Sequence, residues 1–177
     1  MLRSASVLLG VTLLGCTSGA AGEPRLVWEA PTLRLIDQGG TYGRMCRLSD
    51  GTLYSVCERS GGISSRQSRD AGATWSDARE VARWDQGALA NPELLPLRDG
   101  TLVCFYNRRP RAAGGVTPGA PFAIACSRLD TNATAWSAAA VLYEAGRERE
   151  NGCWEPAAVQ LPSGEIQLFF ANEAPYR

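Results

Sequence analysis

Three side chains that could together cleave a glycosidic bond stand at matching places in a repeated sequence pattern. Arg44 lies seven residues before a turn glycine, Gly51, and Glu93 lies seven residues before another, Gly100. In a third copy of the pattern, Glu155 stands two residues upstream of the equivalent position. Two carboxylates can divide the acid and the nucleophile or base roles of glycoside hydrolysis, and an arginine can hold a carboxylate. We therefore predict that these three residues form one site.

These residues also allow ordinary structural explanations. Glu93 could form a salt bridge at a strand end or cap the backbone, and Arg44 could be equally structural. Glu155 stands between Trp154 and Pro156, so an indole and a rigid backbone would hold its carboxylate. We favour it as the first catalytic candidate and place Trp154 among the substrate-binding residues.

The amino-acid composition excludes several other kinds of catalytic and binding site. The 177-residue chain has no histidine, which removes imidazole as a general base or a zinc ligand. Acidic and basic residues balance at 18 each, so no strong field favours nucleic acid or an anionic membrane surface. The cysteines lack C-x-x-C spacing and no acidic run has calcium-ligand spacing, so we expect no metal and no organic cofactor.

The elements that must position the candidate residues are hairpins. The same phrase occurs three times, as Asp50-Gly51, Asp99-Gly100 and Ser163-Gly164, each time between alternating apolar runs. This pattern predicts three β-hairpins, which we expect to turn through two-residue loops.

Further strands follow the first two hairpins. Strand-like runs lie at residues 63–65 and 80–84, and again at 122–126 and 141–143. Four strands in about 50 to 60 residues is the span of a β-propeller blade. We predict an all-β chain of about two and a half blades over residues 25–177. Since the innermost strands of a propeller run in the same sense, residues at equal offsets should ring one mouth of the central channel.

The third unit ends after its hairpin. A propeller closes only with roughly 4 to 8 blades, so we expect this chain to be the N-terminal part of a longer, six-bladed protein. The alternative is an open partial propeller that folds alone or dimerises.

A short motif connects the third and fourth strands of the first unit. In residues 68–75 the serine and aspartate can bond back to the backbone, the glycine can take a positive φ, and the tryptophan can cover the turn. The motif resembles the Asp-box of sialidase-like β-propellers at all five fixed positions: Ser68, Asp70, Gly72, Thr74 and Trp75. The resemblance implies a structural role on the outer part of a blade, with a ligand role as the weaker alternative. A second copy, residues 127–136, is two residues longer.

At the candidate site the sequence matches sialidases at one position and departs from them at another. In sialidases an arginine at the place of Arg44 belongs to a triad that binds the substrate carboxylate. Those enzymes also use an aspartate in the loop that corresponds to residues 58–67, and this loop has none. The departure argues against sialic-acid cleavage by the usual sialidase mechanism.

The Trp-Glu-Pro sequence at residues 154–156 is similar to a strand of exo-arabinanases built on the same propeller. That resemblance implies a catalytic role for Glu155. The unit around Glu93 is more loosely similar to the second blade of that group. Near it, Asn107 and Arg108 could bind sugar hydroxyls or simply end a strand.

The first residues predict export. Residues 1–16 read as a signal peptide that ends like the bacterial lipobox, in which Cys16 would be lipidated, and residues 17–24 would form a tether. Ordinary cleavage near residues 20–22 is the alternative. We expect a protein that is secreted, or anchored by lipid to the periplasmic or outer membrane face. For the remaining cysteines we expect buried free thiols, with Cys46 and Cys57 as one candidate disulfide.

Together these observations favour an exo-acting glycoside hydrolase of the sialidase-like superfamily that removes terminal sugars from a glycan. Its expected partner is a glycan or oligosaccharide, with no nucleic acid, and with membrane contact only through the lipid anchor. A non-catalytic carbohydrate-binding propeller of a cell-surface uptake system is the alternative.

Overall fold

The computed structural model describes residues 27, 32–111, 119–130 and 132–174. The predicted signal peptide, the lipidation site Cys16 and the tether lie outside the described residues. Within those residues, no helix has the length and apolar character needed to cross a membrane. The described residues include one complete 3-10 turn, η2 (Arg149–Asn151).

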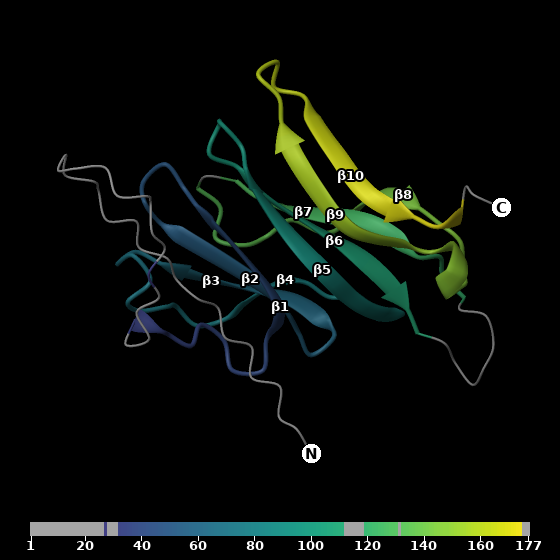
Figure 1. Ribbon diagram of the computed structural model, residues 1–177, viewed down its shortest axis with the longest axis horizontal. Coiled ribbons are helices and arrows are strands. Elements are labelled where there is room, and N and C mark those ends of the chain that lie inside the picture. Colours follow the sequence, from purple (N-terminus) through teal and green to yellow (C-terminus); the bar gives the residue numbers. More distant parts are fainter. Residues whose placement is uncertain (1–26, 28–31, 112–118, 131, 175–177) are drawn as a thin grey trace.

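In the described residues, ten antiparallel strands form two four-stranded sheets and one hairpin (Figure 1). Blade 1 has the order β1-β2-β3-β4 and blade 2 the order β5-β6-β7-β8, while β9 and β10 pair as a half-blade. The innermost strands of successive units, β1, β5 and β9, lie beside one another. This arrangement confirms the predicted all-β propeller blades. The strand bounds are β1 (Thr41–Arg47), β2 (Leu53–Arg59), β3 (Gly62–Ser68), β4 (Arg79–Ala82), β5 (Gly87–Pro96), β6 (Leu102–Pro110), β7 (Ala123–Leu129), β8 (Ala140–Glu144), β9 (Cys153–Gln160) and β10 (Ile166–Asn172).

The three predicted hairpins form, but their loops contain three residues rather than two. In blade 1 the Leu48 N–H donates to the Thr52 carbonyl at 2.8 Å, and Gly51 N–H donates to the Leu48 carbonyl at 3.0 Å. Gly51 has φ +87°, which is the left-handed glycine that closes a three-residue loop. The Asp50 carboxylate also accepts from the Thr52 N–H at 2.9 Å, which fixes the turn. Equivalent bonds close the loops before β6 and β10.

Apolar side chains between the sheets hold the units together. One core lies between blades 1 and 2 and a second lies between blade 2 and the half-blade. Both cores form because side chains along a strand point alternately to its two faces, so that every second side chain faces the neighbouring sheet. The first core contains Val56, Ile63, Val81, Leu89, Leu94, Leu102, Cys104, Tyr106 and Ala125, and the second contains Phe122, Ile124 and Cys153.

The Asp-box of blade 1 is closed by hydrogen bonds among its own fixed residues. The Asp70 carboxylate accepts from Ser68 Oγ at 2.8 Å and from the Thr74 backbone and hydroxyl at 2.9 and 2.6 Å. Ser68 Oγ in turn accepts from the Gly72 N–H at 2.9 Å. Ser68 pairs with Leu53 at the hairpin end of the sheet. The box therefore lies at the opposite end of the blade from the start of β1.

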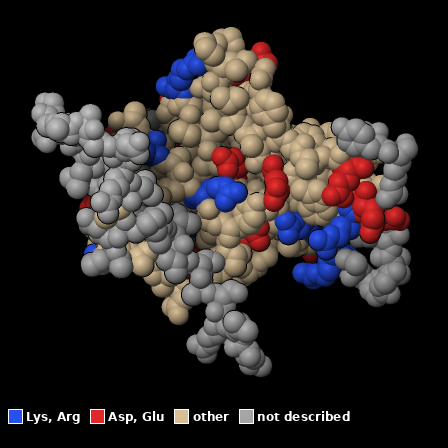
Figure 2. Space-filling model, viewed as in Figure 1, with Lys and Arg blue, Asp and Glu red and all other residues tan. Residues whose placement is uncertain are grey.

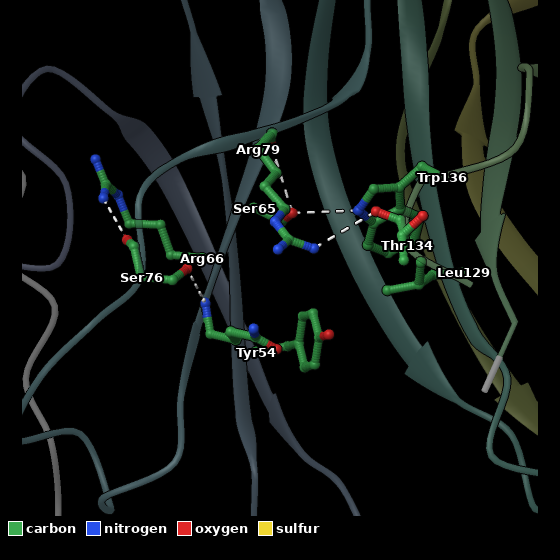
Figure 3. A pocket seen from close by; sticks show the side chains of 9 residues that line it. Tyr54, Ser65, Arg66, Ser76, Arg79, Leu129, Thr134 and Trp136 are labelled. Atoms are coloured by element: carbon green, nitrogen blue, oxygen red, sulfur yellow. Dashed lines mark hydrogen bonds between the residues drawn. The ribbon is translucent and has the colours of Figure 1, made fainter. Parts of the chain in front are cut away.

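The longer second box joins the two blades (Figure 3). The Trp136 indole Nε1 donates to Ser65 Oγ of β3 at 3.2 Å, and Arg79 Nη1 donates to the Thr134 carbonyl at 3.5 Å. Trp75, the corresponding residue of the first box, has a buried indole Nε1 without a hydrogen-bond partner among the described residues. The tryptophan of the second box is thus an inter-blade contact.

The five cysteines that the structure describes are free thiols. Cys57 Sγ lies 3.4 Å from Ser64 Oγ, and Cys46 is paired in register with Tyr54 rather than facing Cys57. Among the described residues, Cys57, Cys104 and Cys153 are buried as expected, whereas Cys46 and Cys126 are only partly buried. The candidate Cys46–Cys57 disulfide does not form.

Candidate active site

A β-bulge occurs at the same place in all three innermost strands. The strand register shifts between Thr41 and Arg44 in β1 and between Ala90 and Glu93 in β5, and again within β9. Each bulge contains one residue in the left-handed region: Tyr42 (φ 53°), Asn91 (φ 49°) and Glu155 (φ 53°).

This conformation is unusual for residues other than glycine, and strain of this kind often occurs at functional sites. A bulge adds one residue to a strand and so redirects the side chains around it. The repeat therefore makes Tyr42, Asn91 and Glu155 structural equivalents, one from each unit.

The bulges bring the predicted site residues together. Tyr42 Oη donates a hydrogen bond to Glu155 Oε1 at 2.9 Å, which links blade 1 to the half-blade. The Arg44 guanidinium carbon lies 4.5 Å from the centroid of the Tyr42 ring, and Arg44 Nε lies 3.3 Å from Glu93 Oε2. One continuous chain of contacts thus runs from Glu155 through Tyr42 and Arg44 to Glu93.

The two carboxylates have different surroundings. Glu155 is exposed, and its Oε1 accepts a hydrogen bond from the Tyr42 hydroxyl. Glu93 is partly buried, and burial raises its pKa above the ordinary value although the Arg44 guanidinium opposes this shift. Acidic and basic side chains meet near the middle of the face formed by the innermost strands (Figure 2).

A cleft of about 600 Å³ opens beside Glu155. This size lies within the usual range for small-molecule sites. The Trp154 indole forms part of its wall, with the Phe122 ring centroid 5.0 Å away in an edge-on arrangement. The residues that line the cleft come from blade 2 and the half-blade: Asn91, Arg109, Pro110, Phe122, Arg149, Trp154, Glu155, Ala171 and Glu173.

Asn107 and Arg108 do not line this cleft. Asn107 has no exposed surface, so it cannot contact a sugar directly. In the amide orientation that satisfies its neighbours, it donates to Asn91 Oδ1 at 2.8 Å and accepts from Arg109 Nε at 3.2 Å. Arg108 lies on the other side of β6, with its guanidinium carbon 5.4 Å from the Trp84 ring centroid.

Sequence reasoning missed residues of the site that include Tyr42, Asn91, Arg109 and Arg149. A signal for the first two was present, because each stands nine residues before its turn glycine, as Glu155 does. A second signal was Pro92 and Pro156, which follow two of the bulge residues, since proline inside a strand is largely confined to edges and bulges.

No group of three or more histidine, cysteine, aspartate or glutamate side chains suited to a metal ion occurs in the part of the chain that the structure describes.

Comparisons with known proteins support the fold. No protein-family model and no curated protein matches the sequence. Among solved structures, the chain is similar to the Hadza microbial sialidase Hz136, with 12% identity and a TM-score of 0.55 over 76% of this chain and 35% of that one. It is also similar to a protein of unknown function from Dyadobacter fermentans DSM 18053, with 14% identity and a TM-score of 0.55.

The second match covers 77% of this chain and 52% of the other. The chain therefore spans between about a third and about half of the length of these two structures. At these identities the likeness shows a sialidase-like β-propeller fold.

Proposed function

We propose that this protein is an exo-acting glycoside hydrolase of the sialidase-like superfamily, with Glu155 and Glu93 as its catalytic carboxylates. The observation that carries this proposal is the contact chain that joins the two residues at one mouth of the propeller through Tyr42 and Arg44. Arginine and carboxylate side chains from separate blades meet there although they are far apart in the sequence.

The surroundings of the two carboxylates suggest how they would divide the work. Glycosidases need one protonated carboxylic acid and one carboxylate. Glu93 suits the acid, because burial raises its pKa. Glu155 suits the nucleophile or base, because it is open to solvent and its Oε1 is held by the hydrogen bond from the Tyr42 hydroxyl.

In this assignment Arg44 has a positioning role. Its guanidinium is engaged by Glu93 on one side and by the Tyr42 ring on the other. This differs from the substrate-carboxylate role that the sialidase resemblance implies, since the guanidinium already contacts Glu93 and the Tyr42 ring.

The test uses the full natural gene product and a panel of 4-nitrophenyl and 4-methylumbelliferyl glycosides, including arabinofuranoside and sialic acid derivatives. Glu155→Gln should lower kcat by at least about 100-fold, the usual minimum contribution of a general acid or base. Its melting temperature should stay near that of the wild type, because Glu155 is exposed. Glu165→Gln is the matched control, because Glu165 is an exposed glutamate at the β9–β10 turn.

A Glu155→Gln variant that retains the wild-type rate would refute the catalytic role. Sugar binding without turnover by the wild-type protein would instead support the non-catalytic binding propeller.

A further inference from the structure

The cleft beside Glu155 contains two arginines, Arg109 and Arg149, that form no ion pair with any residue that the structure describes. Among the described residues, neither Arg109 nor Arg149 has an acidic oxygen within the 4.0 Å of an ion pair, whereas Arg44 is paired with Glu93. Two guanidinium groups without a carboxylate partner in one cleft can bind an anionic ligand without first breaking an ion pair. The arginines available to an anion therefore lie in the cleft, whereas the Arg44 guanidinium already contacts Glu93.

Arg109 is held in place by buried amides. Its Nη2 donates to Asn91 Oδ1 and its Nε donates to the Asn107 carbonyl oxygen. Asn91 and Asn107 are 4% and 0% exposed. Because both anchors are buried and Asn91 sits in the left-handed bulge, the guanidinium is positioned before any ligand binds.

Trp154 brings the second arginine to the same place. The guanidinium carbons of Arg109 and Arg149 lie 5.4 and 6.0 Å from the centroid of its ring. The indole can lie against the backbone because residue 152 is glycine: a Cβ there would stand 2.6 Å from Trp154 Cζ2. The two cations thus share one aromatic platform.

We propose that this cleft is a subsite for a sugar that carries an anionic substituent, a carboxylate or a sulfate ester, bound by Arg109 and Arg149. Guanidinium groups suit such substituents because they offer paired N–H donors. The cleft is also lined by Glu155 and Glu173, which can accept hydrogen bonds from sugar hydroxyls. Cations and carboxylates in one cleft fit a hydroxylated anionic ring better than a bare anion. This inference depends on the proposed function in one respect, which is that the ligand is a sugar.

The test is equilibrium binding to the full natural gene product by isothermal titration calorimetry. The probes are glucuronic acid, glucose 6-sulfate and glucose, at low and at high salt. At least one anionic sugar should bind about tenfold more tightly than glucose, and this preference should weaken as salt rises. The preferred probe then distinguishes a carboxylate from a sulfate ester.

Variants assign the preference to the cleft. Arg109→Gln and Arg149→Gln should each weaken binding of the preferred anionic sugar by about tenfold while changing glucose binding little. Arg149 is exposed and has no part in the amide network, so its variant remains informative if Arg109→Gln is unstable. Arg128→Gln is the control, because Arg128 is an exposed arginine of β7 that pairs with Asp130 at 3.1 Å outside the cleft.

Equal affinity for all three sugars would overturn the proposal, and so would an anionic preference that survives in the Arg109→Gln, Arg149→Gln double variant. Binding does not require turnover, so the two proposals can fail separately. A protein that binds anionic sugars through these arginines but hydrolyses no glycoside would contradict the proposed function alone.

Discussion

Replacing Tyr42 with phenylalanine isolates the contact that joins the two ends of the candidate site. The substitution keeps the ring beneath the Arg44 guanidinium, 4.5 Å from its centroid, and removes only the hydroxyl that donates to Glu155 Oε1 at 2.9 Å. The left-handed backbone of this residue is the same for both aromatic side chains. Any loss of stability or activity in Tyr42→Phe therefore reports on this one hydrogen bond.

The expected free-energy cost of Tyr42→Phe depends on how exposed the hydrogen bond is to solvent. A hydrogen bond to a charged group contributes about 1.5–3 kcal/mol when it is shielded from solvent. Tyr42 is 36% exposed and Glu155 is exposed, so water can replace the lost donor. We therefore expect about 1 kcal/mol, which corresponds to roughly a fivefold change in a rate or an equilibrium constant.

A double-mutant cycle in urea unfolding measures this energy without any substrate. Tyr42→Phe and Glu155→Ala are made singly and together, because alanine leaves no acceptor for the Tyr42 hydroxyl, and the coupling should be about 1 kcal/mol. The same cycle with Glu165→Ala in place of Glu155→Ala should give no coupling, because Glu165 lies at the β9–β10 turn. A Tyr42–Glu155 coupling within the usual additivity error of about 0.3–0.5 kcal/mol would show that the contact is not formed in solution.

Two further predictions concern the boxes. Hydrogen bonds from the Thr74 side chain and backbone, and then from Ser68, lower the Asp70 pKa from 3.8 to about 2. The ionised Asp70 carboxylate therefore stabilises the fold above pH 3.8, and this contribution is lost as the pH falls through about 2. The melting-temperature difference between wild type and Asp70→Asn should therefore shrink between about pH 4 and about pH 2, and a difference independent of pH would contradict this account. Trp136→Phe removes the indole donor to Ser65 Oγ and should cost about 1 kcal/mol in urea unfolding. Combined with Ser65→Ala, which also removes a bond to the Arg79 carbonyl, the two costs should be less than additive, whereas fully additive costs would count against the inter-blade bond.

The sequence predicts the local features well because their causes are local. The Asp50-Gly51 turn forms since an aspartate can accept from the backbone two residues on and a glycine can adopt φ +87°. The Asp-box closes for the same reason, because Asp70 meets the donors of Thr74 four residues later. Only the loop length differs, with three residues in place of two.

The candidate site is harder to predict because it depends on strand register. The bulge shifts the pairing of β5 with β6 by one residue between Ala90 and Glu93. A sequence shows alternation along β6, but it does not show which of two neighbouring arginines faces which blade. For this reason Arg108 was predicted as a substrate contact, while Arg109 is the residue that lines the cleft. The offset of Arg44 and Glu93 was informative because both follow the bulge by the same distance.

The repeated bulge also makes the site modular. One backbone geometry, set nine residues before a turn glycine, carries a tyrosine, an asparagine and a glutamate in successive units. Since the same kink accepts three such different side chains, the identity of the residue is decoupled from the framework that supports it. Tyr42, Asn91 and Glu155 are therefore equivalent backbone positions, and the side chain that each unit places there sets what that unit contributes to the site.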